Sequence, residues 1–141
     1  MKLSVKSRGA STWMEPLYML ADSIQIEQVV LNLCTNAWQA MGEVGGRIEV
    51  GIGRAEAAAA VLFERPAAGR HINLWVADDG AGMDEATRQR AFDPFFSTKG
   101  PAKGTGLGLS ICYSIIKDHG GTIEIDSEKD KGTRFTIKIP V

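Results

Sequence analysis

The sequence lacks both long apolar runs and an excess of charge of either sign. No segment of the 141 residues reaches the roughly 18 consecutive apolar residues of a membrane-spanning helix, and the opening MKLSVKSRGAST lacks the apolar core of a signal peptide. We therefore expect a cytoplasmic protein, or the cytoplasmic part of a larger one, without direct membrane contact. The net charge of −1 gives no electrostatic basis for binding nucleic acid.

Cysteine and histidine are also scarce. The two cysteines, Cys34 and Cys112, both stand in apolar helical patterns, which favours buried thiols over a disulfide or a metal site. The two histidines, His71 and His119, are far apart and have no cysteine or acidic cluster around them. A metal site built on histidine is therefore not expected.

What the sequence does contain is the composition and patterning of one soluble domain. The chain is 44% hydrophobic and 23% charged, and we treat residues 1–141 as a single domain, with the first strands in 1–20 and the motif-bearing part in 21–140. Apolar periodicity predicts helices over residues 22–41, 84–92 and 107–119, and strands over 3–7, 13–20, 47–54, 71–77, 122–127 and 133–140.

The order of these elements predicts the fold class. Strands and helices alternate without a repeated strand–helix–strand unit, so we expect an α+β fold. Its form is a two-layer α/β sandwich with helices on one face of a mixed, mainly antiparallel sheet. Asp22 can cap the first helix, with Gln25 reaching back as in a capping box. The Ala-rich stretch 55–70 is interpreted as a surface connection and 93–106 as a loop.

The first predicted helix carries amides where a solvated face would carry charges. Gln28, Asn32, Asn36 and Gln39 lie three or four residues apart and so form one stripe opposite the apolar side. Lys or Glu would be better helix formers on a surface that faces only water. The stripe therefore either faces something polar and partly buried, or consists of asparagines that make local hydrogen bonds.

The stretch ADDGAGM follows a predicted strand directly. It places Asp78 where the chain turns, with Gly80 and Gly82 removing side chains just beyond it. A carboxylate held there can accept a hydrogen bond from an exocyclic amine such as that of adenine, and the glycines let a flat ring approach the backbone. An ordinary Asp-Gly turn explains this motif equally well on its own.

The stretch GTGLGLS places Gly104, Gly106 and Gly108 at the start of a predicted helix. Free amides at a helix N-terminus attract phosphate, and glycine allows close approach. No strand leads into the motif and no Gly-Lys-Ser/Thr is present, which excludes a dinucleotide fingerprint and a P-loop. The composition of residues 91–103 is typical of a loop that covers a ligand, and we expect this loop to be mobile until nucleotide binds. Phe92 and Phe95 fit equally well as apolar anchors of the loop.

Three features together predict one nucleotide site: an aspartate that can bind adenine, glycines that can bind phosphate, and the amide stripe. Nucleotide phosphates bring Mg²⁺, which takes oxygen ligands and retains several waters. Asn36 can offer its carbonyl oxygen directly, and Asn32, one turn earlier, could bind a water or a phosphate oxygen.

The motifs in this order resemble those of sensor histidine kinases. They are NLCTNAWQAM, DDGAGM, FDPFFSTK, GTGLGLS and the closing hairpin GGTIEIDSEKDKGTRFTIKIP. The resemblance implies the Bergerat ATP-binding fold, shared with gyrase, a heat-shock chaperone and mismatch-repair ATPases. It implies that Asn36 binds Mg²⁺, Asp78 binds the adenine amine, and Gly104, Gly106 and Gly108 line the triphosphate of ATP.

The resemblance also implies the wider residue set of the site. Lys99 belongs to the ATP lid and is assigned to catalysis with Asn32 and Asn36, and Thr133 lies near the adenine through water. The remaining nucleotide-binding residues implied by these motifs are Gln39, Gly80, Gly82, Met83, Phe95, Thr98, Thr105, Leu107 and Leu109.

Two departures bear on function. Many relatives carry a basic residue where this chain has Gln39, and Lys99 or Lys103 would have to replace its phosphate contact. Neither His71 nor His119 stands in the acceptor context of the family. We therefore expect transfer to a histidine-bearing dimerisation domain, an indirect link to a response regulator, and a monomeric isolated domain.

Three other functions were considered for the same fold. A hydrolysing ATPase of the gyrase or chaperone branch carries a glutamate as general base one turn before the metal-binding asparagine, and here that position is Asn32, which cannot take a proton. A nucleotide-sensing module would bind nucleotide without transferring phosphate. The presence of Asn36, Asp78 and all three glycines argues against this function. An anti-sigma-factor serine kinase remains a variant, although the long FDPFFSTK segment is more similar to the histidine kinases.

Overall fold

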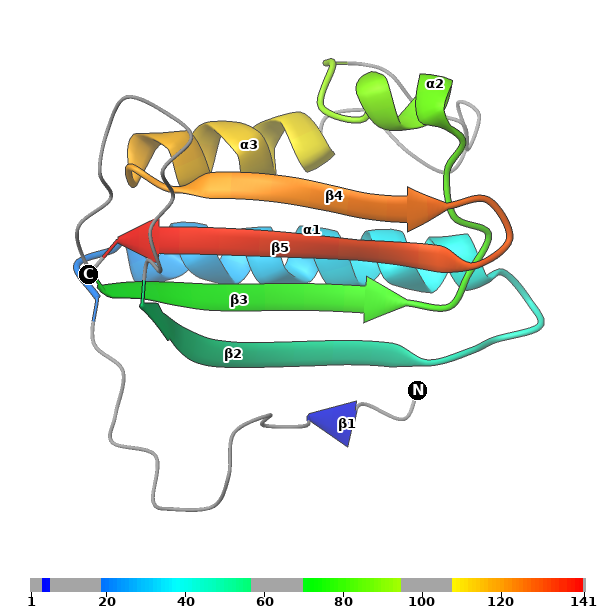
Figure 1. Cartoon of the computed structure of the whole chain (residues 1–141), viewed down its shortest axis with the longest axis horizontal. Helices are drawn as coiled ribbons and strands as arrows, with labels where there is room; N and C mark the ends of the chain where they lie inside the picture. The colour runs from blue at the N-terminus through cyan, green and yellow to red at the C-terminus, as the bar shows by residue number, and fades with distance from the viewer. Residues whose placement is uncertain (1–3, 6–18, 57–69, 95–107, 141) are drawn as a thin grey trace.

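The computed structural model describes residues 4–5, 19–56, 70–94 and 108–140 (Figure 1). Along the chain the elements are β1 (Ser4–Val5), α1 (Ser23–Met41), β2 (Ile48–Glu56), β3 (Arg70–Asp78), α2 (Glu85–Gln89), α3 (Gly108–Asp118), β4 (Thr122–Glu128) and β5 (Gly132–Pro140).

The strands form one sheet in the order β1-β2-β3-β5-β4. β1 runs parallel to β2, whereas the pairs β2–β3, β3–β5 and β4–β5 are antiparallel. The helices α1 and α3 pack against each other, and Figure 1 shows α1 behind the sheet and α3 along its β4 edge. The predicted two-layer α+β sandwich with a mixed, mainly antiparallel sheet is confirmed.

The apolar side of α1 packs against both the sheet and α3. Val29, Leu33 and Ala37 are buried at successive turns, as the helical periodicity predicts. They join one apolar core with residues of both layers: Ile48, Val76, Ala91, Cys112, Ile115, Ile116, Ile123, Ile125, Phe135, Ile137 and Ile139. This core holds the helices that carry the site rigidly against the sheet.

The start of α1 corrects one detail of the prediction. The Asp22 carboxylate caps the helix by accepting hydrogen bonds from the Ile24 and Gln25 amides, at 3.0 and 3.2 Å. The Asp22 amide, which a capping box would give to the Gln25 side chain, donates instead to Nε2 of His119 at 3.1 Å. The capping-box expectation for Gln25 was therefore wrong, because a residue 97 positions away binds that amide.

The outer face of the sheet contains a buried aromatic residue that the alternation pattern did not predict. Ile72 and Val76 point into the core as expected, but Trp75 on the opposite face is only 7% exposed. Its indole lies across its register partner Gly51, where a Cβ would approach the ring to 1.9 Å. The Arg134 guanidinium lies 5.3 Å from the ring centroid.

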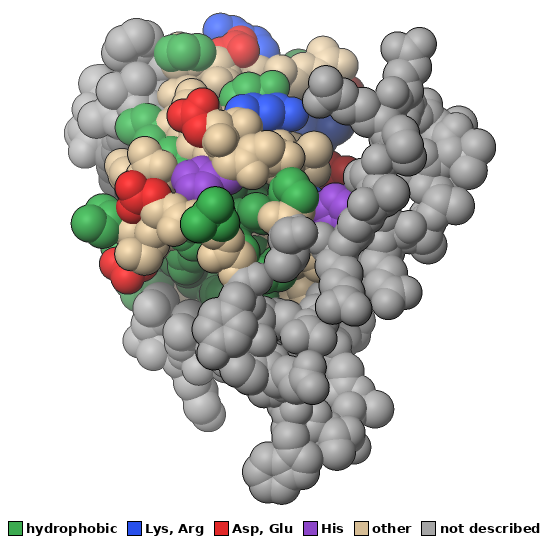
Figure 2. All heavy atoms as spheres, turned by 90° about the vertical axis from the view of Figure 1, so that its left-hand side faces the viewer, with side chains coloured by type: hydrophobic (Ala, Val, Ile, Leu, Met, Phe, Trp, Pro, Cys, Tyr) green, Lys and Arg blue, Asp and Glu red, His purple; other side chains and the backbone are tan. Residues whose placement is uncertain are grey.

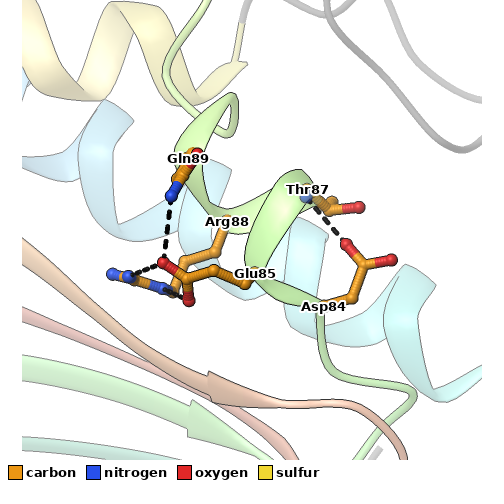
Figure 3. Close-up of polar contacts among 5 residues, drawn as sticks. All are labelled: Asp84, Glu85, Thr87, Arg88 and Gln89. Atoms are coloured by element: carbon orange, nitrogen blue, oxygen red, sulfur yellow. Dashed lines mark hydrogen bonds and ion pairs between the residues drawn. The ribbon is translucent and has the colours of Figure 1, made fainter.

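The short helix α2 is stabilised by contacts within its own sequence (Figure 3). Asp84 accepts a hydrogen bond from the Thr87 amide at 2.7 Å. Hydrogen bonding by the Thr87 side chain, followed by this amide, lowers the pKa of Asp84. Glu85 accepts hydrogen bonds from Arg88 and Gln89, and the Arg88 contact is the largest cause of the lowered pKa of Glu85. The predicted capped helix is confirmed.

The third helix and the closing hairpin also match their predictions. Cys112, Ile115 and Ile116 of α3 are buried, and the helix is followed by Gly120 at φ +71°. β4 and β5 pair around the turn that residues 129–131 form.

Several predictions fall wholly or mainly outside the described residues. The first is the strand at 13–20, of which only Met19 and Leu20 are described and carry no regular structure. The second is the connection at 55–70, whose described residues 55, 56 and 70 belong to β2 and β3. The third is the loop at 93–106 with the cover at 91–103, of which residues 91–94 are described. Within the described part of the chain, both cysteines are free, Cys112 buried and Cys34 half-buried. No described helix is long and apolar enough to cross a membrane.

Candidate nucleotide-binding site

The four side chains of the amide stripe of α1 differ in their burial. Gln28 and Gln39 are exposed, whereas Asn32 and Asn36 are half-buried. A polar, partly buried environment was one of the two explanations for this stripe. The structure supports it for the two asparagines and not for the two glutamines.

Asn32 joins α1 to the first turn of α3. Its Nδ2 donates to the Gly108 carbonyl oxygen at 3.4 Å. A hydrogen bond from Asn32 also reaches the Cys112 thiol, although burial dominates there and raises the pKa of Cys112 to about 11. The helix start that carries Gly108 and Leu109 thus lies against the stripe. The structure brings these two predicted parts of the site together.

Asp78 ends β3 and sits beside Gly80. Oδ1 of Asp78 accepts the Gly80 amide hydrogen bond at 2.9 Å, which fixes one carboxylate oxygen. A Cβ on Gly80 would lie 2.6 Å from the Ala40 carbonyl oxygen, and that oxygen accepts the Ala81 amide at 3.1 Å. The turn after Asp78 is therefore pressed against the last turn of α1. This contact explains why glycine is required at position 80.

The two neighbouring aspartates have different surroundings. Asp79 is exposed, and its Oδ1 accepts the Arg47 amide at 2.8 Å, which ties the loop to the residue before β2. Asp78 is half-buried and lies on the core side of the sheet, the side of Val76. Only Asp78 is therefore directed toward the layer between sheet and helices.

Gly82 connects the same loop to the β4–β5 turn. It adopts φ +65°, and a Cβ there would lie 2.0 Å from the Glu128 carbonyl oxygen. The Asp130 amide donates to the Ala81 carbonyl oxygen at 2.6 Å, beside this contact. The loop that follows Asp78 is consequently held from both sides, by α1 and by the hairpin.

A polar row crosses the end of the sheet at the level of Asp78. Asp78 is the register partner of Thr133, and Thr133 is the register partner of Ser127. Register partners point to the same face, with Cβ atoms about 4.5–5.5 Å apart. Thr133 is 7% exposed and is the buried polar side chain found among the described residues. Asp78 and Thr133, both predicted site residues, therefore lie side by side.

The remaining predicted site residues divide into two groups. Met83 follows Gly82, and its amide donates to Oγ of Ser127 at 2.8 Å. The others lie outside the described residues: Phe95, Thr98, Lys99, Gly104, Thr105, Gly106 and Leu107. Lys103, the alternative to Lys99, lies outside them too.

Both histidines lie far from Asp78. His71 pairs with Pro140 at the opposite end of the same two strands, about 23 Å from Asp78 at the usual strand rise. Figure 2 faces that end, and both histidine side chains are visible there. His119 holds α1 through the Asp22 amide, and its Nδ1 lies 2.7 Å from the Ile115 carbonyl oxygen. Neither imidazole is placed to exchange groups with a ligand beside Asp78.

Two contributors to the site were missed by sequence reasoning. The Ala40 carbonyl oxygen is a backbone group, which no residue type could reveal. Ser127 could have been identified from its strand alternation, because it lies on the same face as the inward Ile123 and Ile125.

Comparisons with known proteins identify relatives of the chain from residue 21 onward. The family model described as histidine kinase-, DNA gyrase B-, and HSP90-like ATPase matches residues 21–141. Sensor kinase CckA of Brucella abortus is 46% identical over 85% of this chain. The solved catalytic domain of histidine kinase ThkA is 36% identical, with a TM-score of 0.64 over 85% of this chain and 68% of that one.

A third relative was solved with a bound nucleotide analogue. Full-length ShkA in complex with AMPPNP is 25% identical, with a TM-score of 0.63 over 82% of this chain and 21% of that one. The chain spans only 13% of CckA and 23% of sensor histidine kinase ZraS of Escherichia coli. The relatives therefore contain much sequence that has no counterpart here.

Proposed function

Because this chain belongs to the family of histidine kinase-, DNA gyrase B-, and HSP90-like ATPases, we propose that it is the ATP-binding catalytic domain of a sensor histidine kinase. The proposed reaction transfers the γ-phosphoryl group of Mg-ATP to a histidine on a separate dimerisation domain. The single observation that carries the proposal is the polar row at the end of the sheet, with Asp78 beside the buried Thr133 and the Gly80–Gly82 turn held between α1 and the hairpin.

The base-binding role of Asp78 rests on its fixed orientation. Oδ1 accepts the Gly80 amide, and a carboxylate has about four acceptor sites, so the same group can also accept the exocyclic amine of adenine. Guanine would present a carbonyl oxygen there, and two acceptors repel. The pocket should therefore prefer ATP to GTP.

The metal-binding role falls to Asn36. Its side-chain oxygen is a hard neutral donor on a half-buried helical position, which fits Mg²⁺ because this ion takes few protein ligands and keeps its waters. When bound, Mg²⁺ compensates the charge on the phosphates. Many relatives have a basic residue at the position of Gln39, and here Lys99 or Lys103 would supply that positive charge instead.

The nature of Asn32 argues for transfer over hydrolysis. An amide cannot accept a proton from water, and its Nδ2 already donates to the Gly108 carbonyl oxygen. ATP can then persist until a histidine nitrogen attacks the γ-phosphorus in line, the bond to the bridging oxygen breaks, and ADP leaves.

The acceptor, by this proposal, is outside the chain. The two histidines of the chain lie at the far end of the sheet, and one of them holds a helix cap. The proposed partners are a histidine-bearing dimerisation domain and, through it, a response regulator. Such signalling uses cytoplasmic ATP, and the isolated domain would be a monomer.

A transfer assay tests the proposal. The isolated chain with Mg²⁺ and labelled ATP should neither label itself nor turn over ATP rapidly. Addition of a histidine kinase dimerisation domain should yield label that is lost in acid and kept in base, as expected of a phosphoramidate. The rate should be low because no covalent tether concentrates the partners.

The opposite results identify the competing functions. Rapid ATP turnover by the isolated chain would support the hydrolase, and acid-stable label on an added protein would support the serine kinase. Failure to bind ATP would refute the nucleotide site as a whole.

A further inference from the structure

Ser127 contacts both the loop after β3 and the start of β5, next to the register pair of Asp78 and Thr133. Its Oγ accepts the Met83 amide at 2.8 Å, lies 3.1 Å from the Gly132 carbonyl oxygen, and lies 2.8 Å from Oγ1 of Thr133. These partners belong to the loop after β3 and to the first two residues of β5. One hydroxyl therefore connects the glycine turn to the buried threonine.

The Ser127 hydroxyl has one proton and two acceptors within reach. If it donates to the Gly132 carbonyl oxygen, then Thr133 must donate to Ser127 for the two hydroxyls to stay bonded. If it donates to Thr133, the Thr133 hydroxyl can donate its own hydrogen bond toward the ligand side. The Met83 amide occupies one Ser127 lone pair in either arrangement. Without a ligand, the first arrangement pairs both hydroxyl protons, whereas the second needs an acceptor for the Thr133 proton.

We propose that Ser127 is a positioning residue for the adenine, acting through Thr133. In the ligand-bound arrangement Ser127 donates to Thr133, and the Thr133 hydroxyl then donates to a water or a ring nitrogen beside Asp78. The inference rests on the proposed nucleotide site. It adds a residue that does not itself touch the nucleotide.

The row geometry supports an action through Thr133. Ser127, Thr133 and Asp78 are successive register partners across β4, β5 and β3, and Thr133 is nearly inaccessible to solvent. A buried hydroxyl without its partner carries an unsatisfied polar group. Removing the Ser127 hydroxyl would leave Thr133 free to rotate away from Asp78.

A double-mutant cycle measured by calorimetric ATP binding tests this inference. Ser127→Ala should raise the dissociation constant for ATP about three- to tenfold, the value of one hydrogen bond. Thr133→Val should have a similar effect, and the double variant should be no worse than Thr133→Val alone. Ser127→Thr, which keeps the hydroxyl on a strand residue, should bind ATP within about twofold of the wild type.

Two further readouts separate positioning from general support of the fold. In the transfer assay Ser127→Ala should raise the KM for ATP and leave kcat unchanged. The control Thr122→Ala removes an exposed hydroxyl from the outer face of the same strand and should change neither constant. If Ser127→Ala does not fold, Ser127→Cys replaces it in the cycle, because a thiol has similar shape and is a weak donor.

The possible failures are distinct. No ATP binding by the wild type would overturn the proposed function. Normal binding by the wild type with unchanged affinity in Ser127→Ala, or additive effects in the cycle, would overturn only the role of Ser127.

Discussion

The two ends of the candidate site are built differently. The base end, around Asp78 and Gly82, is defined by backbone: glycines with no room for a Cβ, and amides bonded to the last turn of α1 and to the hairpin. The amide stripe of α1 consists of side chains on a regular helix whose backbone is already satisfied. The base end thus depends on shape, and the stripe depends on single functional groups.

This difference predicts two kinds of mutational effect. A glycine substitution at the base end should disturb both folding and binding, since the loop contacts β4, β5 and α1 at once. A substitution of Asn36 on the stripe should remove one ligand and leave folding nearly unchanged.

The largest effect is expected for Gly82→Ala. The new Cβ would meet the Glu128 carbonyl oxygen at 2.0 Å and would be held at φ +65°. We expect a loss of about 3 kcal/mol or more in the free energy of unfolding, measured by urea denaturation, together with a loss of ATP binding. Gly45→Ala is the matched control, because Gly45 has φ +73° but open space around it. It should lose only about 1–2 kcal/mol. Equal losses for both variants would contradict the steric account.

A smaller and more specific effect is expected for Asp78→Ala. It removes one charge-assisted hydrogen bond to the adenine and should weaken ATP binding by about 1.5–3 kcal/mol in calorimetry. The control is Asp79→Ala, which removes the neighbouring carboxylate and its contact with the Arg47 amide. It should lower stability modestly and leave ATP affinity unchanged. Similar ATP affinity for both variants would remove Asp78 from the site.

The smallest effect on folding is expected for Asn36→Ala. The free energy of unfolding should change by no more than about 0.5 kcal/mol, whereas phosphoryl transfer should be lost with the metal ligand. Thr35→Ala, at an exposed neighbouring position, is the control and should retain transfer. Normal transfer by Asn36→Ala would place the metal elsewhere.

The sequence predicted the elements well because their signals are local. Asp22, Asp84 and Gly42 mark the helix ends where the structure has them, and the alternation of β4 and β5 matches their burial. The residues brought together at Asp78 were also named in advance, since motif resemblance carries spatial information that periodicity lacks.

The errors come from contacts between distant segments. The Asp22 amide bonds to His119 instead of Gln25, because the end of α3 packs beside the start of α1. Trp75 is buried on the outer face, because Gly51 on the neighbouring strand leaves space for an indole. The proposed role of Ser127 depends on its register with Thr133, although the alternation of β4 already indicates that Ser127 points inward. Each depends on which strands or helices become neighbours, and one sequence does not contain that information in local form.

The most direct test of the account is calorimetric ATP binding with and without Mg²⁺, for the wild type, Asp78→Ala and Asn36→Ala. Asp78→Ala should raise both dissociation constants by the same factor, since the base contact is independent of the metal. Asn36→Ala should raise only the constant measured with Mg²⁺. Equal weakening by Asn36→Ala in both conditions, or unchanged constants for Asp78→Ala, would contradict the division of the site into a base end and a metal-binding stripe.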